Sequence, residues 1–369
     1  MEFDSRLKNG LLVGITILGV NTALVLSGIG DGDTRAEPPP NLPYTISLPR
    51  SEVQRDPERE RTNTLQSKLG FHDTPFPGGS IYSGPVTKRV IEMGGRSLIA
   101  LNPRDEILDQ AAEKGIAVIA RYYSRDNRVN EKELGNLVTR MKKYQETSPI
   151  IVPFNEVNLL HEIGGIYRSP EEHIEKDFLP AYKLISSKGG ITLLTPLAQN
   201  AVVYEDGREV DEFEYLQRML LTLRKYLIDD ELQSVALGVH AYAMTPGKDI
   251  GPRLTEINKI TRENLGIDMP MYITEGGLHQ TSETNYTPQL VANETKRLLQ
   301  TPVGTIRNIK IYGLWVIANN GQRKNDEQNS DVMKAFDAAA IIDPTGKLTE
   351  TGLTLKQLAQ EQTQIQIFP

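Results

Sequence analysis

After residue 68 the chain alternates between segments with the apolar spacing of a helix and short, nearly continuous apolar runs. The apolar runs predict strands at residues 70–72, 97–101, 116–120, 150–154, 191–194, 235–239, 271–273 and 310–314. The amphipathic segments predict helices at residues 85–93, 106–114, 131–144, 170–187, 212–227, 254–264, 288–299 and 353–360. Strands without apolar alternation are buried on both faces, and strands separated by helices pair in parallel.

Three helix starts support this reading. Asn130 with Glu133 has the spacing of a capping box, and Ser169 and Thr287 each precede a proline at the first helical position. Eight strand and helix units predict an α/β fold, a (β/α)8 TIM barrel that occupies residues 69–369. An open doubly wound sheet is the alternative, but it requires a glycine-rich phosphate turn that the chain lacks.

The N-terminal segment has a different pattern. Arg6 and Lys8 precede an apolar run at residues 11–29, which is long enough to cross a bilayer. We expect residues 1–30 to be an uncleaved signal anchor, that is, a transmembrane helix, with the body of the protein outside the cytoplasm. A cleaved secretory signal, which would make the protein secreted, and a buried helix are the alternatives.

Residues 31–68 lack apolar periodicity and are rich in proline and charge. They predict a flexible, disordered linker between the N-terminal helix and the barrel, although an ordinary loop would have a similar composition.

Composition excludes several kinds of site. The chain has 369 residues, of which 38% are hydrophobic, and its net charge of -7 argues against nucleic acid as a partner. Because there is no cysteine, disulfides, thiolate metal sites and cysteine nucleophiles are excluded.

Two glutamates follow apolar runs where catalytic groups of a barrel lie. Glu156 ends the fourth predicted strand and Glu275 ends the seventh. Burial of a carboxyl group disfavours its charged form, so such a pair suggests acid and base chemistry. The other polar and aromatic residues at predicted strand ends are His72, Asp73, Asn102, Arg104, Arg121, Tyr122, Tyr123, Asn155, Asn158, Gln199, Asn200, His240, Tyr242, Trp315, Asn319 and Asn320. Amides and carboxylates bind hydroxyl groups and flat rings cover a pyranose face, so this set suits a sugar.

The arrangement resembles clan A of the glycoside hydrolases, the 4/7 superfamily of retaining TIM-barrel glycosidases. The resemblance rests on Asn155-Glu156 at the fourth strand and Glu275 at the seventh, with His240-Ala241-Tyr242 and Trp315 on the strands next to it. It covers the whole predicted barrel and implies hydrolysis of a polysaccharide or oligosaccharide. It does not single out one family within the clan.

The resemblance also implies a role for each residue. Glu156 would be the general acid/base and Glu275 the nucleophile that forms a covalent glycosyl-enzyme. Tyr242 would orient the Glu275 carboxylate, and Asn155 would bind the sugar 2-hydroxyl.

The remaining candidates would complete the substrate site. His240 would support the catalytic residues, Trp315 would form the floor of the subsite, and either Arg121 or Arg104 would pair with Glu275. Two further candidate substrate-binding residues are His72 and Asn319.

Two other functions remain open. A metal-dependent hydrolase would use the histidines near strand ends, which are His72, His161, His240 and His279, but they lack a metal-binding spacing. A non-catalytic, surface-tethered glycan-binding barrel would have lost one of the two carboxylates, and both are present. We therefore expect no metal and no cofactor.

Overall fold

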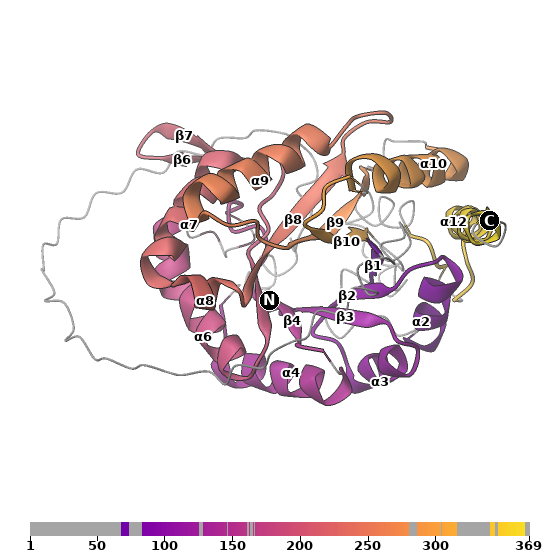
Figure 1. Cartoon of the computed structure of the whole chain (residues 1–369), viewed down its shortest axis with the longest axis horizontal. Helices are drawn as coiled ribbons and strands as arrows, with labels where there is room; N and C mark the ends of the chain where they lie inside the picture. Colours follow the sequence, from indigo (N-terminus) through magenta and orange to yellow (C-terminus); the bar gives the residue numbers. More distant parts are fainter. Residues whose placement is uncertain are drawn as a thin grey trace, which may run out of the picture. The chain divides into compact units, whose positions relative to one another are not determined.

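The computed structural model describes residues 68–365, apart from 74–82, 125–127, 146, 161, 163–164, 166, 280–285, 304, 316–339 and 344–345. In this part of the chain, eight parallel strands form a closed barrel in the order β1, β10, β9, β8, β5, β4, β3, β2 (Figure 1). These strands are β1 (Leu69–His72), β2 (Ser97–Leu101), β3 (Ala117–Arg121), β4 (Ile150–Val152), β5 (Ile191–Leu194), β8 (Val235–Ala243), β9 (Met271–Leu278) and β10 (Ile309–Leu314). The predicted (β/α)8 barrel is confirmed.

The helices lie around the outside of the strands (Figure 1). They are α2 (Ser83–Glu92), α3 (Asp105–Glu113), α4 (Glu131–Tyr144), α5 (Pro170–Glu172), η2 (His173–Phe178), α6 (Leu179–Ser187), α7 (Glu212–Tyr226), α8 (Asp229–Leu232), α9 (Gly251–Leu265), α10 (Pro288–Leu298), η3 (Leu299–Val303) and α12 (Glu350–Ile365). The helix predicted at 170–187 is divided by the π-helical turns of η2. Pro180 has no N–H for the carbonyl four residues earlier, so an unbroken α ladder cannot pass through it.

The predicted membrane helix at 1–30 lies outside the described residues, as does the linker except for its last residue, Lys68. None of the helices that the structure describes combines the length and the apolar character needed to span a bilayer.

Two apolar layers explain the continuous apolar runs. The barrel interior holds one side chain from each of six strands: Ile99, Ile119, Val152, Leu193, Ala236 and Ile311. Neighbouring residues in the same strands, such as Leu98, Val118 and Ile151, belong to the larger core beneath the helices. Both faces of the strands are therefore apolar.

The three predicted helix caps are present. The side chains of Asn130, Ser169 and Thr287 accept hydrogen bonds from backbone N–H groups in the first turns of α4, α5 and α10. In the predicted capping box at Asn130, the backbone N–H of Asn130 does not bond Glu133 directly. The Asn130 N–H donates to the hydroxyl of Tyr122, and this hydroxyl donates to Glu133, so the tyrosine links the two residues.

Several strand limits differ from the prediction. β4 ends at Val152 because Pro153 has no N–H for a ladder. β8 and β9 continue well beyond their predicted ends, so His240, Tyr242 and Glu275 lie within strands. An antiparallel hairpin, β6 (Val202–Glu205) and β7 (Arg208–Asp211), is inserted between β5 and α7 and was not predicted.

Candidate active site

A β-bulge between β8 and β9 places Glu275 inside the barrel. Val239 pairs with Ile273 but His240 pairs with Glu275, so Thr274 is left out of the register. Ile273 belongs to the outer core, and in a regular strand Glu275 would face the same way. The extra residue reverses the direction of the Glu275 side chain and brings it beside His240.

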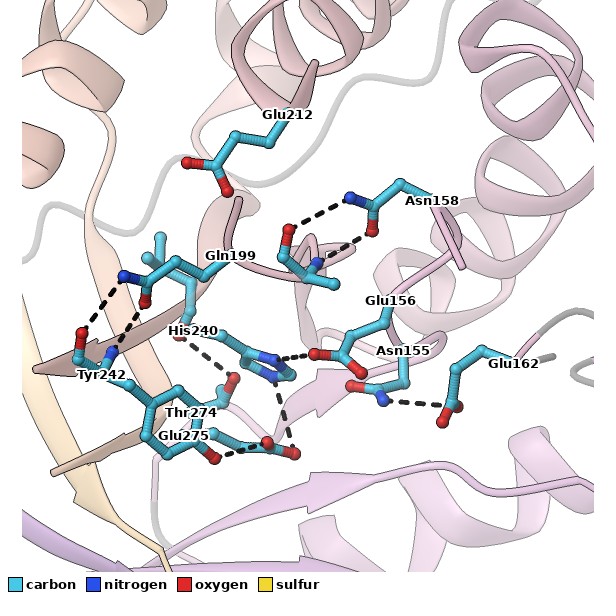
Figure 2. A network of polar contacts seen from close by, with 12 residues as sticks. Asn155, Glu156, Asn158, Glu162, Gln199, Glu212, His240, Tyr242, Thr274 and Glu275 are labelled. Atoms are coloured by element: carbon cyan, nitrogen blue, oxygen red, sulfur yellow. Dashed lines mark hydrogen bonds and ion pairs between the residues drawn. The ribbon is translucent and has the colours of Figure 1, made fainter. Parts of the chain in front are cut away.

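Glu156 is positioned by an unusual backbone conformation. Its φ angle is +39°, in the left-handed region that costs energy for a residue with a side chain. The Glu156 N–H donates to the carbonyl oxygen of Pro196 at 2.9 Å, which holds this turn. This turn lies in the loop after β4, and it directs the carboxyl group toward His240 (Figure 2).

His240 lies between the two glutamates (Figure 2). Its Nδ1 is 2.8 Å from Oε1 of Glu156, and its Nε2 is 3.6 Å from Oε1 of Glu275. One carboxylate oxygen of each glutamate and one ring nitrogen of His240 all lie within 4.8 Å of one another. The structure thus brings together the two carboxyl groups that the sequence separates by more than a hundred positions.

Glu275 is held as an ionised group. Arg121 Nη1 donates to its Oε1 at 2.5 Å, and the Tyr242 hydroxyl donates to its Oε2 at 2.9 Å. Burial alone would raise the pKa of Glu275. The charge of Arg121, those of His240 and His72 when these rings are protonated, and the hydrogen bond from Tyr242 together lower this pKa to about 2. Arg121 is the permanent cation among them. Arg104, the alternative partner, is exposed next to α3.

Tyr242 and His72 are neutral parts of the same region. Burial and the nearby charge of Glu275 raise the pKa of Tyr242, so its hydroxyl keeps the proton that it donates. Burial lowers the pKa of His72 to about 3. The ring of His72 packs against Trp315, with ring centroids 4.5 Å apart.

Glu162 is a third carboxyl group of this region, and the pattern of apolar residues does not predict it. It lies in the loop after β4, and Nδ2 of Asn155 donates to its Oε2 at 3.4 Å (Figure 2). Burial, followed by the negative charge of Glu156, raises the pKa of Glu162. Its position in an irregular loop has no periodicity that would have marked it.

Several polar residues at strand ends are engaged with the backbone instead. The side chain of Asn102 bonds both backbone groups of Tyr123, and that of Asn158 bonds both backbone groups of Ala198. Asn319 lies outside the described residues.

The metal alternative does not fit the geometry. Glu156, His240 and Glu275 form a cluster of three possible donors, and His161 lies outside the described residues. However, His240 uses opposite ring nitrogens for the two carboxylates, and its 2.8 Å contact with Glu156 is a hydrogen-bond distance. A metal ion would need lone pairs from all three residues directed to one point.

The chain is similar to known proteins in its fold. No protein-family model matches the sequence, and no curated protein is significantly similar to it. Solved structures with a similar fold include glycoside hydrolases, so the resemblance to the clan A-like TIM-barrel glycosidases is confirmed for the fold, without a specific family.

Three of these structures illustrate the similarity. A family 2 β-galacturonidase from Eisenbergiella tayi is 16% identical, with a TM-score of 0.52, over 79% of this chain and 50% of that one. A family 39 glycoside hydrolase from Bacteroides cellulosilyticus is 12% identical, with a TM-score of 0.51, over 80% of this chain and 64% of that one. A family 128 endo-β-1,3-glucanase from Amycolatopsis mediterranei is 14% identical, with a TM-score of 0.45, over 79% of this chain and 99% of that one.

Proposed function

We propose that this protein is a retaining glycoside hydrolase in which Glu156 is the general acid/base and Glu275 is the nucleophile. The observation that carries the proposal is that oxygens of the two carboxyl groups lie within 4.8 Å of each other. Retaining glycosidases hold these groups about 5–5.5 Å apart, whereas inverting enzymes leave about 6.5–9.5 Å for a water molecule.

The environments of the two glutamates support different roles. Glu275 is ionised beside Arg121 and Tyr242, as a nucleophile must be. Glu156 has no cationic side chain in direct contact within the described residues except, when it is protonated, His240. In the first step Glu275 attacks the anomeric carbon while Glu156 gives a proton to the leaving oxygen, and in the second step Glu156 accepts a proton from water.

The substrate would be a polysaccharide or oligosaccharide. Asn155 adjoins the catalytic pair, and the His72 and Trp315 rings pack together near Glu275. An amide and an aromatic ring are the groups that bind the hydroxyls and the apolar face of a sugar. Glycoside hydrolases are also found among the neighbours with TM-scores above 0.5, and one of these is described as bound to galacturonate.

A screen of aryl glycosides and polysaccharides tests this proposal, with Glu275→Gln as the control. We expect turnover by the wild type and glycan binding without turnover by the variant. Binding without turnover by both proteins would instead identify a glycan-binding barrel.

We further propose that residues 1–30 anchor the enzyme in a membrane with the barrel outside the cytoplasm. The support is the apolar run at residues 11–29 behind two basic residues. Fractionation of cells that express the full chain tests this, because deletion of residues 1–30 should move the protein from the membrane to the soluble fraction.

A further inference from the structure

Strand β8 extends beyond the neighbouring strand β5. The register between them ends where Leu194 pairs with Leu237, and residues 238–243 of β8 continue without a β5 partner. On its other side β8 remains paired with β9 up to Ala243. The extension carries His240 and Tyr242, which contact Glu156 and Glu275. The part of β8 that carries His240 and Tyr242 therefore has no neighbouring strand on its β5 side.

Two side chains occupy this edge. In a parallel strand, every second residue directs its N–H and C=O to the same neighbour, and buried backbone groups need partners. The side-chain amide of Gln199 bonds both backbone groups of Tyr242. Its Nε2 donates to the Tyr242 carbonyl oxygen at 3.1 Å, and its Oε1 accepts from the Tyr242 N–H at 2.8 Å (Figure 2). Nη1 of Arg253 donates to the carbonyl oxygen of His240 at 2.5 Å.

These two supports are joined by Glu212. Arg253 makes two bonds to the buried Glu212 carboxylate, at 2.9 Å and 3.1 Å. The same carboxylate accepts from the backbone N–H of Asn200 at 2.9 Å, and Asn200 follows Gln199 in a left-handed turn with φ of +59°. The Arg253 guanidinium and the Gln199 amide are thus parts of one connected frame behind β8.

We propose that Gln199 and Arg253 are positioning residues that replace the missing strand and keep Tyr242 and His240 in contact with the two glutamates. Neither residue touches the reacting carboxylates in the described structure. They act through the backbone of β8, and their contribution to catalysis rests on the function proposed above.

The kinetic test uses three variants of the two positioning residues. Gln199→Ala and Arg253→Met should lower kcat by up to about 100-fold with little change in KM, because a misplacement of about 1 Å at a catalytic group has that effect. In Gln199→Ala the acid limb of the kcat/KM profile should also move to higher pH, since a displaced Tyr242 hydroxyl no longer stabilises ionised Glu275. Arg253→Lys, which can still bond Glu212 and the His240 carbonyl, should recover part of the lost kcat.

Matched controls separate positioning from general loss of stability. In Gln145→Ala, the lost amide bonds the Val118 carbonyl in another strand, and in Arg218→Met, the lost guanidinium bonds Glu171 and Glu205. Both should lower thermal stability and leave kcat and the pH profile unchanged. If Gln199→Ala and Arg253→Met behave as these controls do, the proposal is wrong.

Crystal structures of Gln199→Ala and Arg253→Met provide a test that needs no substrate. We expect a longer distance between the Tyr242 hydroxyl and Glu275 in the first and between His240 and Glu156 in the second. Unchanged distances in both would overturn the proposal even if the wild type is an active glycosidase. Conversely, changed distances would uphold the structural role of the two residues even if no glycoside is cleaved.

Discussion

Nη1 of Arg121, on β3, lies 2.5 Å from Oε1 of Glu275, on β9, and both side chains are almost completely buried. The two strands are not neighbours in the barrel, so the ion pair spans its interior. A positive charge at this distance favours the ionised carboxylate and offsets the effect of burial, which by itself would raise the pKa of Glu275.

Replacement of Arg121 by methionine should therefore change the pH dependence of the reaction. Without the guanidinium, Glu275 binds a proton at a higher pH, so the ionised form that the proposed mechanism requires is lost at a higher pH. We expect the acid limb of kcat/KM to move upward by about one to three pH units. Rate measurements across the acidic range check this. Arg140→Met, which removes an exposed pair with Asp105, should leave the limb in place.

The same pair affects folding stability. The pKa of Glu275 is lowered to about 2 in the folded state, so its ionised form contributes stability above the pKa of an unfolded glutamate, about 4.3. This contribution is lost as the pH falls from there toward 2. Denaturant titrations at several pH values should show a weaker decline for Arg121→Met than for the wild type. An identical decline in the two proteins would show that Glu275 is not paired in solution.

Loss of the proposed nucleophile should be partly compensated by a small anion. Glu275→Ala should lower turnover by about 10⁴-fold or more, as expected when a covalent catalyst loses its nucleophile. Azide fits the space left by the carboxylate, and we expect it to restore part of the rate with formation of a glycosyl azide. Turnover that is unaffected by the substitution would contradict the role of Glu275. In Glu156→Ala, azide should attack from the other face during the second step and give the opposite anomer.

Two glycine substitutions should change stability in opposite directions. A Cβ on Gly313 in β10 would lie 2.5 Å from the Ile99 side chain and 3.0 Å from the Ile273 carbonyl, so Gly313→Ala should destabilise the barrel by about 1–3 kcal/mol. A Cβ on Gly135 in α4 would make only ordinary contacts, at 3.5 Å or more. Gly135→Ala should therefore stabilise the protein by about 0.5–1 kcal/mol through helix propensity. Chemical denaturation measures both, and equal effects would contradict the packing argument.

The barrel could be predicted because its strands are buried on both faces. Leu98 and Ile99 face opposite apolar layers, so the run at 97–101 has no alternation and contrasts clearly with the helices on either side. The β6–β7 hairpin also has a signal in the sequence. Asp206-Gly207, both with positive φ, forms the turn between these strands, and this dipeptide is typical of tight hairpins.

The geometry of the site could be predicted only in part. Glu156, Glu275 and Tyr242 were recognised by their positions along the chain, but the bulge at Thr274 that directs Glu275 inward has no sequence pattern of its own. The support of β8 by Gln199 depends on the unequal lengths of two strands. Apolar runs alone underestimated β8, because its last residues alternate between site residues and alanine.

The role of Glu156 can be separated from that of its neighbour Glu162 by varying the leaving group. A general acid contributes most when the departing oxygen is a poor leaving group, and its contribution is about 10²–10⁴-fold. Glu156→Gln should therefore lower kcat/KM strongly for alkyl glycosides and weakly for dinitrophenyl glycosides, whose leaving oxygen needs no proton. In Glu162→Gln, the amide oxygen can still accept the hydrogen bond from Asn155, and a nearby carboxylate is removed. The change in kcat/KM should therefore be the same for every leaving group. A Brønsted plot for each variant measures the difference. A steeper slope for Glu162→Gln than for Glu156→Gln would show that Glu162 is the general acid. Parallel plots for the two variants would contradict proton donation by Glu156.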